Sequence, residues 1–111
     1  MNKNIISDGK FYIENHDLIG IKEHCSNIKN SSQHLGYLIN YQYIFIQYFN
    51  HACLKKSKEI IVFLIMLYYE IFDEISKIAL RQCFFYGKYI IKNDRSFTKW
   101  YNEYIIKLFK I

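Results

Sequence analysis

Proline is absent from this chain and glycine is scarce, with four residues among 111. These two residue types are the ones that most often interrupt a helix. Neither of them occurs between Leu38 and Tyr86. Long helices are therefore permitted over almost half of the chain.

Cysteine is also rare. The three cysteines, Cys25, Cys53 and Cys83, form an odd set without a CxxC pair, and we identify no secretory signal before them. This pattern predicts reduced thiols in a cytoplasmic protein. His51 and Cys53 form one short pair, but no second pair completes a zinc-type site, so no metal or other cofactor is expected.

Sequence motifs of the common enzyme classes are missing as well. The chain has no P-loop, no GxGxxG, no zincin motif and no nucleophile elbow. Its most apolar run, residues 60–69, is bracketed by Glu59 and Glu70 and is much shorter than the roughly 20 residues that cross a bilayer. We expect no membrane insertion.

What the chain has is a strongly apolar composition. Hydrophobic residues make up 51% and charged residues 23%, a balance that favours folding over disorder. The length fits a single domain over residues 1–111. Apolar residues recur at spacings of three and four, which predicts an all-α fold, a compact bundle of three to four helices.

Three helices are predicted after residue 30. The first is capped by Ser31 or Ser32 and runs to about residue 54, the second covers residues 58–86 with Gly87 as its stop, and the third is capped by Asp94 or Ser96 and ends near residue 110. The predicted buried face of the second consists of Ile60, Phe63, Leu64, Leu67, Ile71, Ile75, Ile78 and Phe85.

Residues 1–30 are harder to interpret. Asp8-Gly9 is typical of a turn between two short strands, which favours a hairpin. Over residues 16–28 the spacing of apolar side chains instead favours an amphipathic helix with Leu18, Ile21, Cys25 and Ile28 buried. We predict this helix, preceded by a short irregular or hairpin-like segment.

A polar patch is predicted on the central helix. Asp73 and Lys77 have the spacing of an ion pair along a helix. The patch has two interpretations, structural polar contacts or a functional site. Its members are Glu70, Asp73, Glu74, Lys77 and Arg81.

The formal charge of +5 arises entirely within residues 31–111. A basic excess supports binding to nucleic acid or to an acidic protein, although lysines in turns also serve solubility alone. Six cations near two predicted turns are the candidates for phosphate or partner contacts. They are Lys55, Lys56, Lys58, Lys88, Lys92 and Arg95.

One part of the sequence resembles a known family. The run YYEIFDEISKIALRQCFFYGK, followed by FTKWYNEYIIKL, is similar to the conserved part of AbiV-type abortive-infection proteins, which are related to HEPN helical bundles. Asp73, Glu74, Ser76 and Lys77 match that family's acidic pair, Gly and Lys, with Asp for one Glu and Ser for Gly. The resemblance covers about half the chain and implies a helical bundle that can dimerise.

The resemblance also bears on catalysis. Active HEPN ribonucleases carry an Arg followed four to six residues later by His, whereas this chain has no histidine after His51, and Tyr104 lies about where the related segment carries one. Tyrosine, with a pKa near 10, is a poor general base at neutral pH. The resemblance therefore implies a noncatalytic protein.

We expect a noncatalytic helical-bundle protein of a defence or phage-host conflict system that binds a protein or RNA partner. One alternative is a small phage-encoded inhibitor of a bacterial nuclease complex such as a CRISPR effector. Another is a divergent, metal-independent HEPN-like ribonuclease that uses Arg95, Glu103 and Tyr104 with the polar patch. A third is a homodimer in which a symmetry mate completes the apolar central helix.

Overall fold

The fold is built from helices that pair in chain order. The computed structural model describes residues 3–35, 41–72 and 74–107, and within these ranges the chain forms six α-helices and no strand. The helices are α1 (Lys3–Glu14), α2 (Leu18–Leu35), α3 (Tyr41–Lys55), α4 (Lys58–Ile71), α5 (Glu74–Ile90) and α6 (Arg95–Tyr101), the last continued by a π-helical segment, η1 (Asn102–Ile106). The predicted all-α class is confirmed, and the predicted count of three to four helices is wrong.

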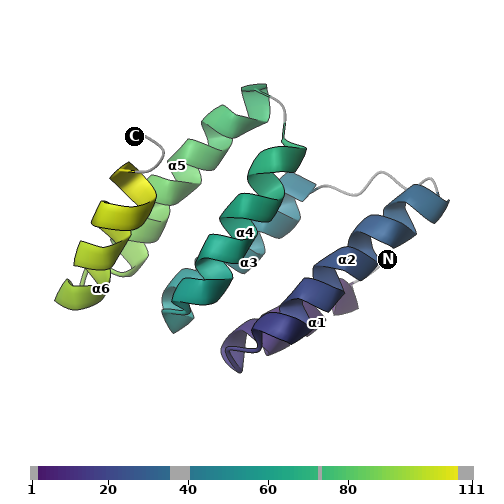
Figure 1. The fold of residues 1–111 in the computed structure, drawn as a ribbon, viewed down its shortest axis with the longest axis horizontal. Helices are drawn as coiled ribbons and strands as arrows, with labels where there is room; N and C mark the ends of the chain where they lie inside the picture. Colours follow the sequence, from purple (N-terminus) through teal and green to yellow (C-terminus); the bar gives the residue numbers. More distant parts are fainter. Residues whose placement is uncertain (1–2, 36–40, 73, 108–111) are drawn as a thin grey trace.

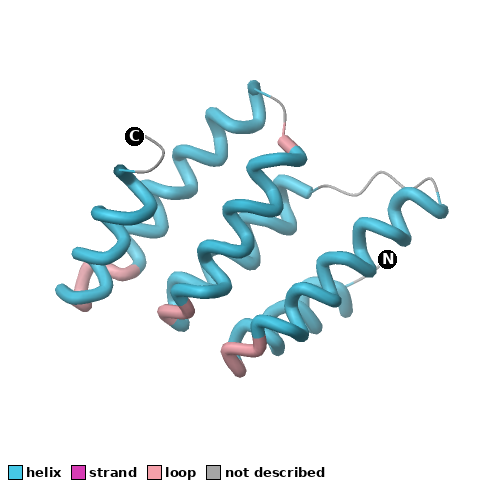
Figure 2. Tube along the Cα trace, viewed as in Figure 1, coloured by secondary structure: helices cyan, strands magenta, loops and turns pink. Residues whose placement is uncertain are grey.

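The six helices form three antiparallel hairpins that stand side by side (Figure 1). Helices α1, α3 and α5 make one layer, and α2, α4 and α6 make the other. The short turns within the three hairpins lie at the same end of the molecule, as Figure 2 shows.

Helix α3 lies at the centre and packs against α1, α4 and α5. The ring of Phe45 contacts Tyr68 and Phe72, and the ring of Phe49 contacts Phe84 of α5, with centroids 5.5 Å apart. The buried side of α3 includes Phe45, Phe49 and Cys53. Its full set is Ile44, Phe45, Tyr48, Phe49, Ala52 and Cys53.

Two glycines allow α3 to approach its neighbours closely. Gly9 and Gly87 were expected in a turn and at a helix stop, but both lie buried within helices, α1 and α5. A Cβ atom on Gly9 would overlap the ring of Tyr48, and one on Gly87 would lie 2.7 Å from Tyr101 Oη and 2.9 Å from Phe49 Cε2. Both glycines therefore serve packing between helices.

The predicted central helix over residues 58–86 is interrupted. Phe72 adopts an extended backbone (ψ 142°) after α4, and its buried ring packs on Phe45 and Tyr68. The chain then reverses, and the apolar register restarts in α5. Among the α5 residues whose side chains are described, which leave out the predicted Ile75, the buried ones are Leu80, Phe84 and Gly87. Ile78 and Phe85, predicted to be buried, are 58% and 51% exposed, so that part of the prediction is wrong.

The N-terminal segment also differs from the prediction. A helix, α1, replaces the hairpin-like segment, and Ser31 and Ser32 lie within α2 instead of starting a helix. The favoured amphipathic helix is confirmed as α2. Its Ile21, Cys25 and Ile28 are buried as predicted, whereas Leu18 is only half-buried.

Helices α4 and α6 both begin after a residue that is typical of an N-cap, and the cap of α6 is a predicted one. Ser57 occupies the N-cap position of α4, although its side chain donates or accepts no capping hydrogen bond. Asp94 caps α6, because its Oδ1 accepts a hydrogen bond from the Phe97 amide at 3.0 Å. The Ser96 hydroxyl, the alternative cap, donates to the same oxygen at 3.1 Å.

Helix α4 is the most apolar helix, yet it has only 14 residues. None of the helices described is long and apolar enough to cross a membrane. Leu64 and Tyr68 are buried, whereas Phe63 and Leu67 are only half-buried. One side of α4 is therefore incompletely covered.

His24 belongs to a polar network that joins α2 to α3 and α1. Its Nε2 lies 2.8 Å from Tyr48 Oη, and the Tyr48 hydroxyl donates to the Ile5 carbonyl at 2.8 Å. Burial lowers the pKa of His24, and burial also lowers the pKa of His51 despite a 3.1 Å contact with Glu14. Both imidazoles are therefore neutral near pH 7, and the contact between His51 and Glu14 is a hydrogen bond at that pH.

The close approach at Gly9 can be tested by Gly9→Ala. Alanine favours a helix over glycine by about 1 kcal/mol. Overpacking a core typically costs about 1–3 kcal/mol, and the Tyr48 ring is held by two hydrogen bonds. We expect G9A to lower the free energy of unfolding in urea titrations, while Ser7→Ala, exposed on the same helix, leaves it within about 0.5 kcal/mol. A G9A protein as stable as the parent would contradict the packing role.

The neutral state of His24 predicts a loss of stability in acid. The unfolded chain binds a proton near pH 6.5 and the folded chain only at lower pH, so stability is complete above pH 6.5 and falls as the pH drops below it. Each pH unit between the two pKa values is worth about 1.4 kcal/mol. Urea titrations between pH 7.5 and 5 should show this slope, and H24Q should reduce it. The exposed turn residue His16 supplies the control, H16N; equal slopes in H24Q and the parent would refute the assignment.

Candidate nucleic-acid interface

Helix α5 has a second apolar side that no neighbouring helix covers. Ile78, Phe85 and Tyr89 are spaced by seven and four residues, which places them on one side of the helix, opposite Leu80 and Phe84. The three side chains are 51–62% exposed. We call this side, with the exposed polar residues beside it, the α5 outer face; its members are Ile78, Arg81, Gln82, Phe85, Tyr86, Lys88, Tyr89 and Lys92.

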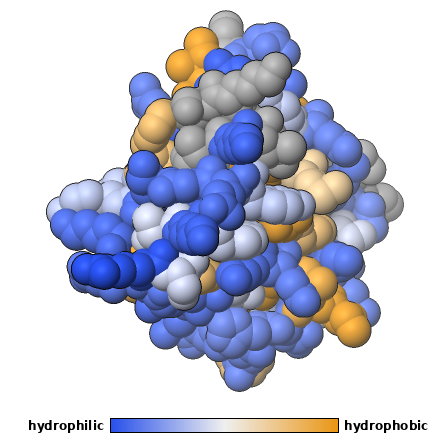
Figure 3. Space-filling model, turned by 60° about the vertical axis from the view of Figure 1, so that its left-hand side comes forward, coloured by the Kyte–Doolittle hydropathy of each residue, from blue (hydrophilic) through white to orange (hydrophobic). Residues whose placement is uncertain are grey.

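The α5 outer face is basic. Arg81, Lys88 and Lys92 are exposed along it, and the sequence from residue 75 to residue 93 contains no aspartate or glutamate. Figure 3 brings the side of α5 and α6 forward and shows hydrophilic residues over most of it, with hydrophobic ones in separate places. A surface of this kind suits a polar anionic ligand better than an apolar partner.

Two tyrosines form a platform at the end of this face. The rings of Tyr86 and Tyr89 stack with centroids 6.4 Å apart and planes 16° from parallel. Lys92 Nζ lies 4.1 Å from the Tyr89 centroid. An ammonium on one ring and a neighbouring exposed ring together offer a phosphate contact and a stacking surface.

The two predicted basic turns lie next to each other. Lys56 Nζ pairs with Asp94 Oδ2 at 3.1 Å, which joins the turn of the second hairpin to that of the third. Hydrogen bonds from the Phe97 amide and from Lys56 hold the pKa of the Asp94 carboxyl below its usual range. Lys55, Lys58 and Arg95 are exposed around this junction. Five of the six predicted cations therefore remain available to a ligand, while Lys56 is engaged.

A second aromatic cluster lies beside the same turns. Trp100 and Tyr104 stack with centroids 5.7 Å apart and planes 12° from parallel. Lys58 Nζ lies 5.4 Å from the Trp100 ring. Together with Glu59 and Val62, these residues line a cavity of about 360 Å³ between α4 and α6.

One candidate catalytic residue, Arg95, lies far from Glu74 of the polar patch. Arg95 begins α6 and Glu74 begins α5, so a helix of 17 residues, about 25 Å long, separates them. Glu103 is exposed, and Tyr104 is 46% exposed against Trp100. Within one chain, Arg95 therefore does not share a cleft with Glu74.

The predicted polar patch is divided between two helices. Glu70 belongs to α4, whereas Glu74, Lys77 and Arg81 belong to α5. Lys77 Nζ pairs with Glu74 Oε1 at 3.4 Å and lies over the ring of Tyr69. The predicted partner of Lys77, Asp73, lies outside the described residues. The pairing of Glu74 with Lys77 is the kind of exposed contact that contributes little to stability.

The cysteines show no sign of activation. Cys25 and Cys53 are buried, and burial raises the pKa of Cys25 to about 11 and raises the pKa of Cys53 still further. Burial also raises the pKa of Cys83. Thiols of this kind are protonated and unreactive at neutral pH. No group of three metal-ligating side chains occurs in the described part of the chain.

Comparisons with protein-family models, with curated proteins and with solved structures found no match to this chain. The resemblance to AbiV-type proteins over residues 68–108 therefore stays a prediction. The functional argument rests on the geometry of the α5 outer face and the turns beside it.

Proposed function

We propose that this protein is a noncatalytic RNA-binding protein whose site is the α5 outer face and the two basic turns next to it. The observation that carries the proposal is the exposed platform of Tyr86 and Tyr89 in a stretch that has cations and no carboxylate. Bases would stack on the rings, and phosphates would contact Lys88, Lys92 and Arg95.

Single-stranded RNA suits this surface better than a duplex. An aromatic side chain can stack only on a base whose faces are free, as in loops and unpaired strands. The cluster of Trp100, Tyr104 and Lys58 supplies a second stacking surface beyond the turn. A strand that crosses the turn could use both clusters, with Arg95 between them.

The absence of catalysis is part of the proposal. It is supported by the separation of Arg95 from Glu74 and by the missing histidine after His51. The AbiV-type resemblance leads us to place the protein in a defence or phage-host conflict system. Stacking and phosphate contacts would serve single-stranded RNA and single-stranded DNA equally. We choose RNA because of the AbiV-type resemblance.

Fluorescence anisotropy with a labelled 12-nucleotide single-stranded RNA tests the proposal. Binding by the full chain should weaken as salt rises, by a slope of about 0.7 for each phosphate contact. In K88Q/K92Q we expect at least tenfold weaker binding and a slope smaller by about 1.4, the value for two lost contacts. Tyr89→Ser should weaken binding about 5-fold to 100-fold at constant slope, through lost stacking.

The matched control is K22Q/K29Q, which removes the same charge from two exposed lysines of α2. We expect it to bind within about twofold of the parent. If K88Q/K92Q and K22Q/K29Q lost the same RNA affinity, net charge alone would explain the loss, and the proposed site would be refuted. A 12-base-pair duplex that binds as tightly as the single strand would refute the stacking argument. Cleavage of the RNA, seen on a denaturing gel and lost in R95Q, would refute the noncatalytic assignment.

A further inference from the structure

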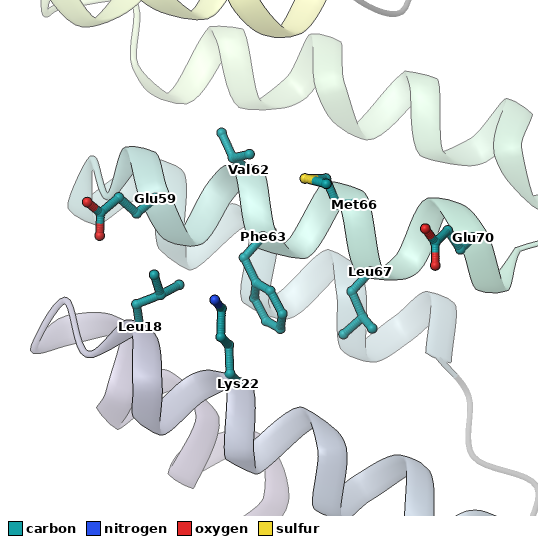
Figure 4. A pocket seen from close by; sticks show the side chains of 8 residues that line it. All are labelled: Leu18, Lys22, Glu59, Val62, Phe63, Met66, Leu67 and Glu70. Atoms are coloured by element: carbon teal, nitrogen blue, oxygen red, sulfur yellow. The ribbon is translucent and has the colours of Figure 1, made fainter.

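A groove lies between α2 and α4, and Figure 4 shows side chains that line it. It holds two adjoining cavities of about 400 and 300 Å³, which share Lys22, Phe63 and Leu67 as lining residues. Gly9 brings α1 close to α3, whereas α2 and α4 make fewer contacts with each other. The groove is therefore a consequence of how the first two hairpins pack.

The surface of the groove on the α4 side is apolar. Val62, Phe63 and Leu67 are half-buried, and Met66, 64% exposed, stands beside them at the edge. Figure 4 shows Leu18 pointing from α2 towards α4, and Phe63 and Leu67 pointing from α4 towards α2. A methionine on an open apolar surface adapts well to the side chains of a partner.

Opposite charges line the two sides of the groove. Lys22 and Lys29 lie on the α2 side, and Lys22 Nζ points towards α4, 5.8 Å from the Phe63 ring centroid. Glu59 and Glu70 lie on the α4 side. Among the residues whose side chains are described, none of these four has an opposite charge within ion-pair distance. A ligand that brings a carboxylate to one side and a cation to the other would satisfy them.

We infer that this groove binds an amphipathic α-helix of a partner protein. The apolar stripe of that helix lies on Phe63, Met66 and Leu67, its acidic edge faces Lys22 and Lys29, and its basic edge faces α4. Helix α4 has 14 residues, about 21 Å, so the bound helix has about four turns. This site shares no residue with the α5 outer face, although Glu59 and Val62 also line the cavity beside Trp100 and Tyr104.

Two other occupants fit less well. RNA would place phosphates against Glu70 on an apolar surface. If a second copy of the chain filled the groove, the exposed apolar surface that it could insert would be its α5 outer face. That face carries Arg81 and Lys88 but no carboxylate, so it could not neutralise Lys22 or Lys29.

A peptide display selection on the full chain tests the inference. The library consists of 16-residue helices with a constant leucine stripe and either glutamate or lysine at each flanking position. We expect enrichment of peptides with glutamates along one edge and lysines along the other. K22E/K29E changes only exposed residues. With this variant, enrichment of peptides with the glutamate edge should fall at least tenfold, and lysine should be enriched at those positions instead.

The selected peptide, synthesised with a fluorescent label, then provides affinities. Met66→Asp should weaken its binding at least tenfold, while K88E/K92E on α5 should leave binding within about twofold. No charge pattern in the selected pool, or an unchanged affinity in M66D, would overturn the inference. So would light scattering that shows a dimer of the parent and a monomer of M66D, because the groove would then hold a second copy.

Discussion

The close contact of α3 with α1 and α5 is the constraint on which the rest of this structure depends. At Gly9 and Gly87 the missing side chains leave room for Tyr48 and for Phe49 and Tyr101. This contact joins three hairpins through one layer of helices. The other layer has no such glycine in α4, and a groove stays open between α2 and α4. The same packing turns the second apolar side of α5 outward, so both proposed binding surfaces follow from it.

Much of the local structure could be predicted from the sequence. The buried side of α2 and the cap at Asp94 follow from spacing and capping preference alone. The break at Phe72 could not, because no proline or glycine marks it and the cause is the packing of its ring on Phe45 in another helix. Gly87 could likewise be taken for a helix stop, because the sequence does not show that the rings of Phe49 and Tyr101 pack against it.

The functional surfaces were predictable only in part. The basic turns were visible as lysine clusters, but only the contact between Lys56 and Asp94 shows that they adjoin. The exposed apolar side of α5 was not predicted, because residues 58–86 were treated as one helix with a single buried face, whereas the helix is interrupted at Phe72. Once a helix is started at Glu74, Leu80 and Phe84 mark one apolar side, and Ile78 and Phe85 mark the other.

The account assigns RNA to the α5 outer face, and photo-crosslinking tests that assignment most directly. A single-stranded RNA that carries 4-thiouridine is irradiated with the full chain, and the crosslinked tryptic peptides are identified by mass spectrometry. The account predicts crosslinks to the peptides of residues 82–88 and 89–92, which contain Tyr86 and Tyr89. Crosslinks confined to α1 or α2, or none at all, would contradict it.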